Sequence, residues 1–257
     1  MSTINPTITL ASLVNEHPDL AGELERRGLD YCCGGQQTLL EACAAQGLDP
    51  ASTTAELAQA ASPTAPKAEW TSMEPVALVE HLVATHHAYL WAELPRLSAL
   101  LTKIVDVHGE RHPELAGVAA CYESVRTDLE PHLLKEERVL FPMIVELAGA
   151  SIVPVFHCGT LRNPISMMLR EHDAVGELLA ELNRLTNGYR VPDDGCASYA
   201  ACFDGLARLE SDTHLHIHKE NNLLFPMVVR MEQSFTEAAT VEPVATRSSN
   251  ESTVRSL

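Results

Sequence analysis

The sequence predicts an all-α protein, in which a small helical unit precedes an antiparallel four-helix bundle. Four long stretches carry apolar residues at the spacing of a helical seam. The motif His-x-x-Lys-Glu-x-x-x-Leu-Phe-Pro-Met occurs in two of them, at residues 132–143 and 216–227. Glycine and proline residues, which end helices, mark the connections between the stretches.

Residues 1–60 are expected to form the small helical unit. Pro18 is placed to open a helix and Gly28 to close it. Further helices are expected at about residues 37–46 and 51–60, each bounded by turn residues.

That loop spans residues 29–35, Leu-Asp-Tyr-Cys-Cys-Gly-Gly. Paired glycines disfavour a helix, so the segment should expose the thiols of Cys32 and Cys33. The alternative is that the cysteines only fill a turn, because adjacent cysteines form only strained disulfides. Residues 61–74 are predicted to be a linker.

Residues 75–235 are expected to form the bundle, and the polar residues 236–257 a disordered tail. The predicted helices run from Pro75 to about Val107, from about Glu114 to Ala148, from near Asn163 to Asn187, and from near Ala197 to Gln233. Prolines inside these helices predict kinks or breaks, at Pro95, Pro131, Pro142 and Pro226.

The seam of each helix is apolar except where it carries histidine or glutamate, with Thr213 the only other polar residue. These polar intruders are His87, His132, Glu136, His172, His216 and Glu220. Residues four apart share a helical face, so each copy of the repeated motif aims one histidine and one glutamate at the same point. A buried, unpaired carboxylate costs several kcal/mol, so these glutamates need a cation or a hydrogen-bond donor.

The positions of the histidines along the helix axes agree with a single site. The midpoint of His87 and His132 falls in the connection between the first two helices, and that of His172 and His216 in the connection between the last two. Both pairs therefore lie level, roughly 33 Å along the helix from their turn. Two facing hairpins would gather four histidines and two glutamates, which suits two iron or manganese ions bridged by carboxylates.

The remaining polar groups are assigned lesser roles. His86 lies off the seam, and His218 lies two residues from His216 and points elsewhere. The other histidines are expected at the surface, in turns or behind the ligands: His81, His108, His112, His157 and His214. A second interpretation of His157, together with the neighbouring Cys158, is a reactive pair or a transient metal ligand.

Two carboxylates and two lysines near the ligands are interpreted as solvent-facing. Glu137 should face away from Glu136. Glu171 precedes a ligand and could support it, but a solvated carboxylate is the favoured interpretation. The equivalent residues Lys135 and Lys219 could orient carboxylates, but exposed lysines that cover apolar surface are favoured.

Composition excludes several classes of function. A formal net charge of −17 argues against sequence-independent binding to nucleic acid or to an anionic membrane. We find no signal peptide and no apolar run near the roughly 20 residues of a membrane span. The seven scattered cysteines predict reduced thiols in a cytoplasm: Cys32, Cys33, Cys43, Cys121, Cys158, Cys196 and Cys202.

Taken together, these motifs resemble the RIC family, the hemerythrin-like di-iron proteins for repair of iron centres. Four segments carry the resemblance: residues 30–35 (Asp-Tyr-Cys-Cys-Gly-Gly), His132-x-x-x-Glu136, Glu171-His172-Asp173, and His216-x-x-x-Glu220-Asn221-Asn222, with His87 at the first ligand position. The resemblance implies two non-haem iron ions with oxo and carboxylate bridges in a four-helix bundle. The longer connection at residues 153–161 and the extended tail depart from the family pattern.

The resemblance also implies repair of iron–sulfur clusters damaged by nitric oxide or oxidants, by iron donation or by nitric oxide removal at the di-iron site. Expected partners are damaged iron–sulfur proteins, nitric oxide or oxygen, and an unidentified electron donor; the oligomeric state is open. The alternative is a module that binds or senses oxygen or nitric oxide. If the protein repairs clusters, we hypothesise that Cys32 and Cys33 transfer iron, nitrosyl groups or electrons.

Overall fold

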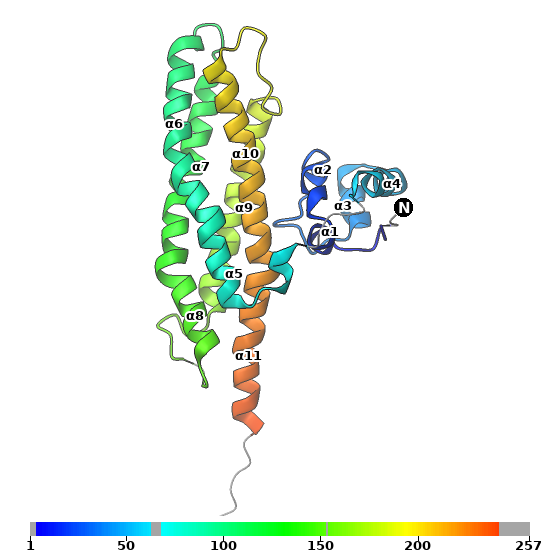
Figure 1. The fold of residues 1–257 in the computed structure, drawn as a ribbon, viewed down its shortest axis with the longest axis vertical. Helices are drawn as coiled ribbons and strands as arrows, with labels where there is room; N and C mark the ends of the chain where they lie inside the picture. The colour runs from blue at the N-terminus through cyan, green and yellow to red at the C-terminus, as the bar shows by residue number, and fades with distance from the viewer. Residues whose placement is uncertain (1–3, 63–67, 153, 242–257) are drawn as a thin grey trace, which may run out of the picture.

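The computed structural model describes residues 4–62, 68–152 and 154–241, with side chains up to residue 235. Four long helical columns form an elongated bundle, and a smaller helical unit lies beside it (Figure 1). This arrangement confirms the predicted all-α bundle. Within the described ranges, no helix is both long and apolar enough to cross a membrane.

The described part of the small unit contains four α-helices, and a side chain caps the start of three of them, at Thr9, Thr38 and Asp49. Its helices are α1 (Leu10–Glu16), α2 (Ala21–Glu25), α3 (Leu39–Gln46) and α4 (Pro50–Ala60). Thr38 and Glu41 form a capping box at the start of α3, which satisfies backbone N–H groups that the helix leaves free. The helix ends at Gly47, whose φ of +68° few other residues tolerate.

Each column of the bundle is a long helix, three of them interrupted by one π-helical turn. The columns are α5 (Pro75–Leu82), Val83–His87 and α6 (Ala88–His108); α7 (Leu115–Lys135), Glu136–Leu140 and α8 (Phe141–Gly149); α9 (Arg162–Leu185); and α10 (Ala197–Lys219), Glu220–Leu224 and α11 (Phe225–Val241). Helix α11 thus continues through residues 236–241 of the predicted tail, and residues 242–257 lie outside the described part of the chain.

The interruptions differ from those predicted from the prolines. Pro95 and Pro131 lie within α6 and α7 without ending them. Pro142 and Pro226 are the second residues of α8 and α11. A π turn precedes each of these helices, and in it a phenylalanine N–H donates to a carbonyl five residues back. The wider turn accommodates the missing proline N–H and inserts one extra residue just where a glutamate ligand is expected.

A polar layer divides the core of the bundle into two apolar halves. One half includes Leu90, Leu129, Val175 and Leu209. The other includes Leu82, Leu140, Ile165 and Leu224. Because the apolar contacts lie above and below, the layer between them is shielded from water on both sides.

The small unit docks on α10 and has its own apolar cluster, which includes Ile217 of that helix. His218 Nε2 lies 2.9 Å from Asn15 Oδ1, and His214 Nδ1 lies 3.1 Å from Glu25 Oε1. Within the predicted linker, residues 63–67 lie outside the described ranges. Trp70 stacks on His81, so this part of the segment contacts the bundle.

Candidate metal centre

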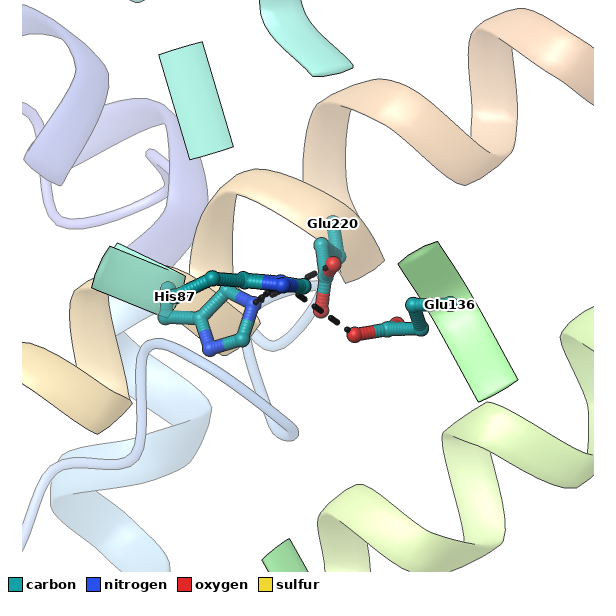
Figure 2. A group of neighbouring side chains, drawn as sticks. His87, Glu136 and Glu220 are labelled. Carbon is teal, nitrogen blue, oxygen red and sulfur yellow. Dashed lines mark hydrogen bonds and ion pairs between the residues drawn. The ribbon is translucent and has the colours of Figure 1, made fainter. Parts of the chain in front are cut away.

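All six predicted ligands meet in the polar layer. Their side chains are at most 2% exposed, although all of them are polar: His87, His132, Glu136, His172, His216 and Glu220. Figure 2 shows three of them, His87, Glu136 and Glu220, directed into one space between the helices. The apolar seam pattern therefore identified side chains that come together in the structure.

The repeated motif places its histidine and glutamate as the helical spacing predicts. His132 Nε2 lies 3.3 Å from Glu136 Oε2, and His216 Nε2 lies 3.3 Å from Glu220 Oε1. Each glutamate is the first residue of a π turn, so its backbone still follows the α-helix that carries its histidine.

The four histidines form two close pairs, and each pair joins two different hairpins. His87 Nε2 lies 3.2 Å from His216 Nε2, and His132 Nε2 lies 3.1 Å from His172 Nε2. Both glutamates approach both pairs. The result is two groups of four possible ligand atoms, each group within 4.8 Å, and the glutamates belong to both.

The surroundings of the two glutamates test whether these residues suit a metal. Imidazole Nε2 atoms lie 3.2–3.5 Å from the carboxylate oxygens. Among the described residues, however, no oxygen of Glu136 or Glu220 accepts a well-aligned hydrogen bond, and all four oxygens are inaccessible to water. Burying two such carboxylates is unfavourable unless cations offset their charge. The donor set of imidazole nitrogens and carboxylate oxygens suits iron, zinc or manganese.

The charges in the layer are strongly coupled. Burial alone would raise the pKa of Glu220, but His216 and His172 hold it well below its usual range. Burial alone would lower the pKa of His132, but Glu136 and Glu171 outweigh burial and raise it to about 10. The metal-free layer therefore contains ionised carboxylates that favour protons on His87 and His132, whereas burial lowers the pKa of His216. A bound cation would take the place of those protons.

Groups behind the ligands orient three of the imidazoles. His87 Nδ1 lies 2.9 Å from Glu137 Oε1, and His132 Nδ1 lies 2.9 Å from Glu171 Oε2. His172 Nδ1 lies 2.7 Å from Asn221 Oδ1. These oxygens can only accept, so each Nδ1 carries the proton and each Nε2 is left to bind a metal.

Glu171 was expected to be solvated, and that interpretation was wrong. Its other oxygen pairs with Lys135, and the hydrogen bond from His132 is the main reason that its pKa falls to about 2. Glu137 does face away from Glu136, as predicted, but it contacts His87 and Trp91 instead of solvent alone. Neither contact follows from the seam, because both join different helices.

Lys219 was predicted to be exposed, and it is buried. Its Nζ donates to His81 Nε2 at 2.9 Å and to His86 Nε2 at 2.6 Å, and it lies 4.3 Å from the centre of the Trp70 ring. Trp70 comes from the segment predicted to be a linker, so Lys219 is covered by residues far away in the sequence. Burial lowers the pKa of Lys219 to about 8.

The thiol loop lies against the same end of α10. Asp30 shapes the loop, because its carboxylate accepts from the N–H groups of Cys32 and Cys33, at 3.0 and 2.9 Å. The two sulfur atoms lie 3.9 Å apart. The neighbouring Cys33 thiol and burial hold the pKa of Cys32 well above its usual range. Asp30, Cys32 and Cys33 could together offer three ligand atoms to a metal.

Two asparagines of the π turn at Glu220–Leu224 bind this loop, and one of them also contacts the polar layer. Asn221 Nδ2 donates to the Cys32 carbonyl at 3.3 Å, while its Oδ1 accepts from His172. Asn222 Nδ2 donates to the same carbonyl at 3.0 Å. A single side chain thus separates the thiol loop from a candidate ligand. His157 and Cys158 belong to none of the potential metal groups found among the described residues.

Comparison with known proteins agrees with this site. Residues 78–228 match the family described as Hemerythrin HHE cation binding domain, and residues 7–61 match a domain of unknown function, DUF542. The chain is 33% identical to the iron-sulfur cluster repair protein YtfE of Citrobacter koseri over 223 residues, which is 87% of this chain and 97% of that protein. Identity to the YtfE protein of Cronobacter sakazakii is 34% over 224 residues, with the same coverage.

Proposed function

The chain belongs to the family of hemerythrin-like iron–sulfur cluster repair proteins, and from this membership we propose that it repairs iron–sulfur clusters damaged by nitric oxide or oxidants. One observation carries the proposal at the level of chemistry. Two fully buried glutamates lie between two pairs of histidines. Such a layer needs positive charge to offset the carboxylates, and metal cations would supply it in place of the protons on His87 and His132.

The proposed cofactor is a pair of non-haem iron ions. His87 and His216 would hold one ion and His132 and His172 the other, and Glu136 and Glu220 would contribute to both. Each ion would have four protein ligands, which leaves open positions for nitric oxide or oxygen and for exchange of the iron itself. Bound iron would supply redox chemistry and affinity for these small molecules.

The protein residues around the ions have separate tasks. Glu137, Glu171 and Asn221 hold the Nδ1 protons, so that Nε2 is the only ligand atom that three of the histidines can offer. The apolar halves of the core exclude water above and below. The outer partners thus fix the orientation of the imidazoles, and the apolar packing protects the site from bulk solvent.

Removal of the bridging carboxylates tests the metal centre. We expect Glu136→Ala and Glu220→Ala each to lose most of the iron, because each glutamate serves both groups. His218→Ala and His86→Ala should keep it, since neither histidine belongs to either group. The measurement is iron per chain together with reactivation of a nitric-oxide-damaged iron–sulfur enzyme. Unchanged iron in both glutamate variants would contradict the site.

We also propose that the thiols of Cys32 and Cys33 transfer iron, nitrosyl groups or electrons between the metal layer and a damaged client. The support is the docked loop and its link through Asn221 to His172. The double Ser variant at these two positions should load iron fully yet reactivate the client enzyme slowly. Cys43→Ser, in the same small unit, is the control. Repair at the parental rate would mean that the thiols are structural.

A further inference from the structure

A second cluster of reactive side chains lies at one end of the bundle, away from the metal layer in its middle. Cys196 is the N-cap of α10, and His108 is the last residue of α6. These two helix ends lie together in the structure, at the end of the bundle away from α8 and α11 (Figure 1). By the rise of an α-helix, Cys196 is about 30 Å from His216. The metal centre therefore does not use this cluster.

The geometry is that of a thiol held against a buried imidazole. His108 Nε2 lies 3.2 Å from Cys196 Sγ. The histidine is only 3% exposed, and the ring of Tyr199 packs edge-on against it at 5.4 Å, whereas Cys196 is exposed. The imidazole is thus fixed by packing while the sulfur faces solvent.

Arg111 determines which ring nitrogen of His108 carries the proton. Its Nη2 lies 3.4 Å from His108 Nδ1, and a guanidinium can only donate. His108 Nδ1 is therefore the acceptor, and Nε2 carries the proton that points at the sulfur. A hydrogen bond of this kind favours the thiolate over the thiol.

Four charged or titratable groups at this end of the bundle are paired with one another. Asp194 pairs with Arg111 at 3.2 Å and with His112 at 2.9 Å, and His112 also lies 3.0 Å from Glu114. The hydrogen bond from His108 and then the backbone N–H groups of Tyr199 and Ser198 lower the pKa of Cys196 to about 7.

Other cysteines of the chain behave differently. Burial raises the pKa of Cys121, and it raises that of Cys202 to about 12. A thiol attacks a disulfide best when its pKa is close to the ambient pH, which balances the amount of thiolate against its nucleophilicity. Cys196 combines this property with exposure and a fixed partner.

We propose that Cys196 and His108 form a thiolate–imidazole pair that reacts with small-molecule disulfides, which makes Cys196 a site of reversible S-thiolation. The Cys196 thiolate attacks one sulfur of the disulfide, a new S–S bond forms and the original one breaks. The Cys196 sulfur is oxidised and the departing sulfur is reduced. The departing thiolate takes a proton from solvent, which replaces the proton that Cys196 lost on ionising.

The product should persist until an external thiol reverses it. Cys202, the next cysteine along α10, is fully buried and cannot reach the exposed sulfur to displace the added group. The added group would cap the end of the bundle without entering the metal layer, so the iron content should not change.

The test uses the full-length, iron-loaded protein and dithiodipyridine, a disulfide that releases a coloured product. Mass spectrometry of peptides assigns the rate at each cysteine over a range of pH. We expect Cys196 to react fastest, with a midpoint near its pKa of about 7, and the fast phase to vanish in Cys196→Ser. Oxidised glutathione should add one group at Cys196 only.

His108→Gln removes the partner, and His112→Gln is the control at the same end of the bundle. Loss of the imidazole should raise the midpoint towards the value of about 8.5 for a free cysteine, and should slow the reaction at about pH 6.5 by up to about fourfold. The backbone N–H groups of Tyr199 and Ser198 remain in this variant, so the shift should stop short of that value. His112→Gln should leave both unchanged. A fast phase that survives Cys196→Ser overturns the proposal. So does a parental midpoint near 8.5, a result that stands even if His108→Gln fails to fold.

Discussion

At the scale of single residues, the outer partners of the histidines decide how the layer binds metal. The four imidazoles are chemically alike, but their surroundings differ. Three have an acceptor at Nδ1, whereas His216 Nδ1 has no hydrogen-bond partner among the described residues and its ring stacks at 5.4 Å on that of His86. The two metal groups are therefore unequal, because only the group with His132 and His172 has both of its imidazoles anchored.

Removing the charge of one outer partner should weaken metal binding without removing a ligand. We expect Glu171→Gln and Glu137→Gln each to lower iron affinity about 10-fold, near the small end of such effects because glutamine keeps an acceptor oxygen. Competition with a chelator, followed by absorption of the bound iron, measures the change. Glu177→Gln, at an exposed position of α9, is the matched control. Affinities within about twofold of the parent would show that these carboxylates do not orient the ligands.

At the scale of elements, close approach of the thiol loop to α10 depends on a residue without a side chain. A Cβ atom added at Gly35 would lie 2.5 Å from the Tyr31 carbonyl oxygen and 2.7 Å from Asn222 Oδ1. The asparagine could turn away, but the backbone oxygen could not. The loop therefore packs against the π turn of Glu220–Leu224 only because residue 35 is glycine.

Gly35→Ala should partly undock the loop. Overpacking of this kind costs about 1–3 kcal/mol, which should lower the melting midpoint and speed hydrogen exchange in residues 30–36. Gly117→Ala is the control, because nothing lies within 4 Å of a Cβ there and alanine favours the helix. Equal exchange rates in the parent and in Gly35→Ala would contradict the packing described for this loop.

At the scale of the whole molecule, the bundle consists of two apolar halves joined by a layer that is charged in the absence of metal. The halves contribute hydrophobic stabilisation on their own, since their buried residues touch within each half. The layer contributes only when cations offset Glu136 and Glu220. Metal removal should therefore loosen the middle and leave the ends folded.

Thermal melting of iron-loaded and metal-free protein checks this expectation. Free metal at about 100 times its dissociation constant stabilises by about 2.7 kcal/mol, which corresponds to a rise of roughly 5–10 °C in the melting midpoint for a protein of this size. Far-ultraviolet circular dichroism should retain the helical signal after metal removal. Equal midpoints, or loss of helix in the metal-free protein, would contradict the prediction.

The sequence by itself determined which side chains converge in the polar layer. Helical spacing is a local property, so the seam and the four-residue step from His132 to Glu136 identify inward-facing groups without knowledge of the neighbouring helices. The same reasoning separated His87 from His86. The metal that these residues bind remains a proposal that chemistry supports.

Only the tertiary structure decided what stands behind the ligands. Glu171 supports His132 because α7 and α9 bring them together, and Lys219 is buried because Trp70, about 150 residues earlier in the sequence, covers it. The docking of the thiol loop and the pairing of Cys196 with His108 also join residues distant in sequence. Such contacts depend on the rotation and height of whole helices, which π turns alter by one residue, and no local pattern records them.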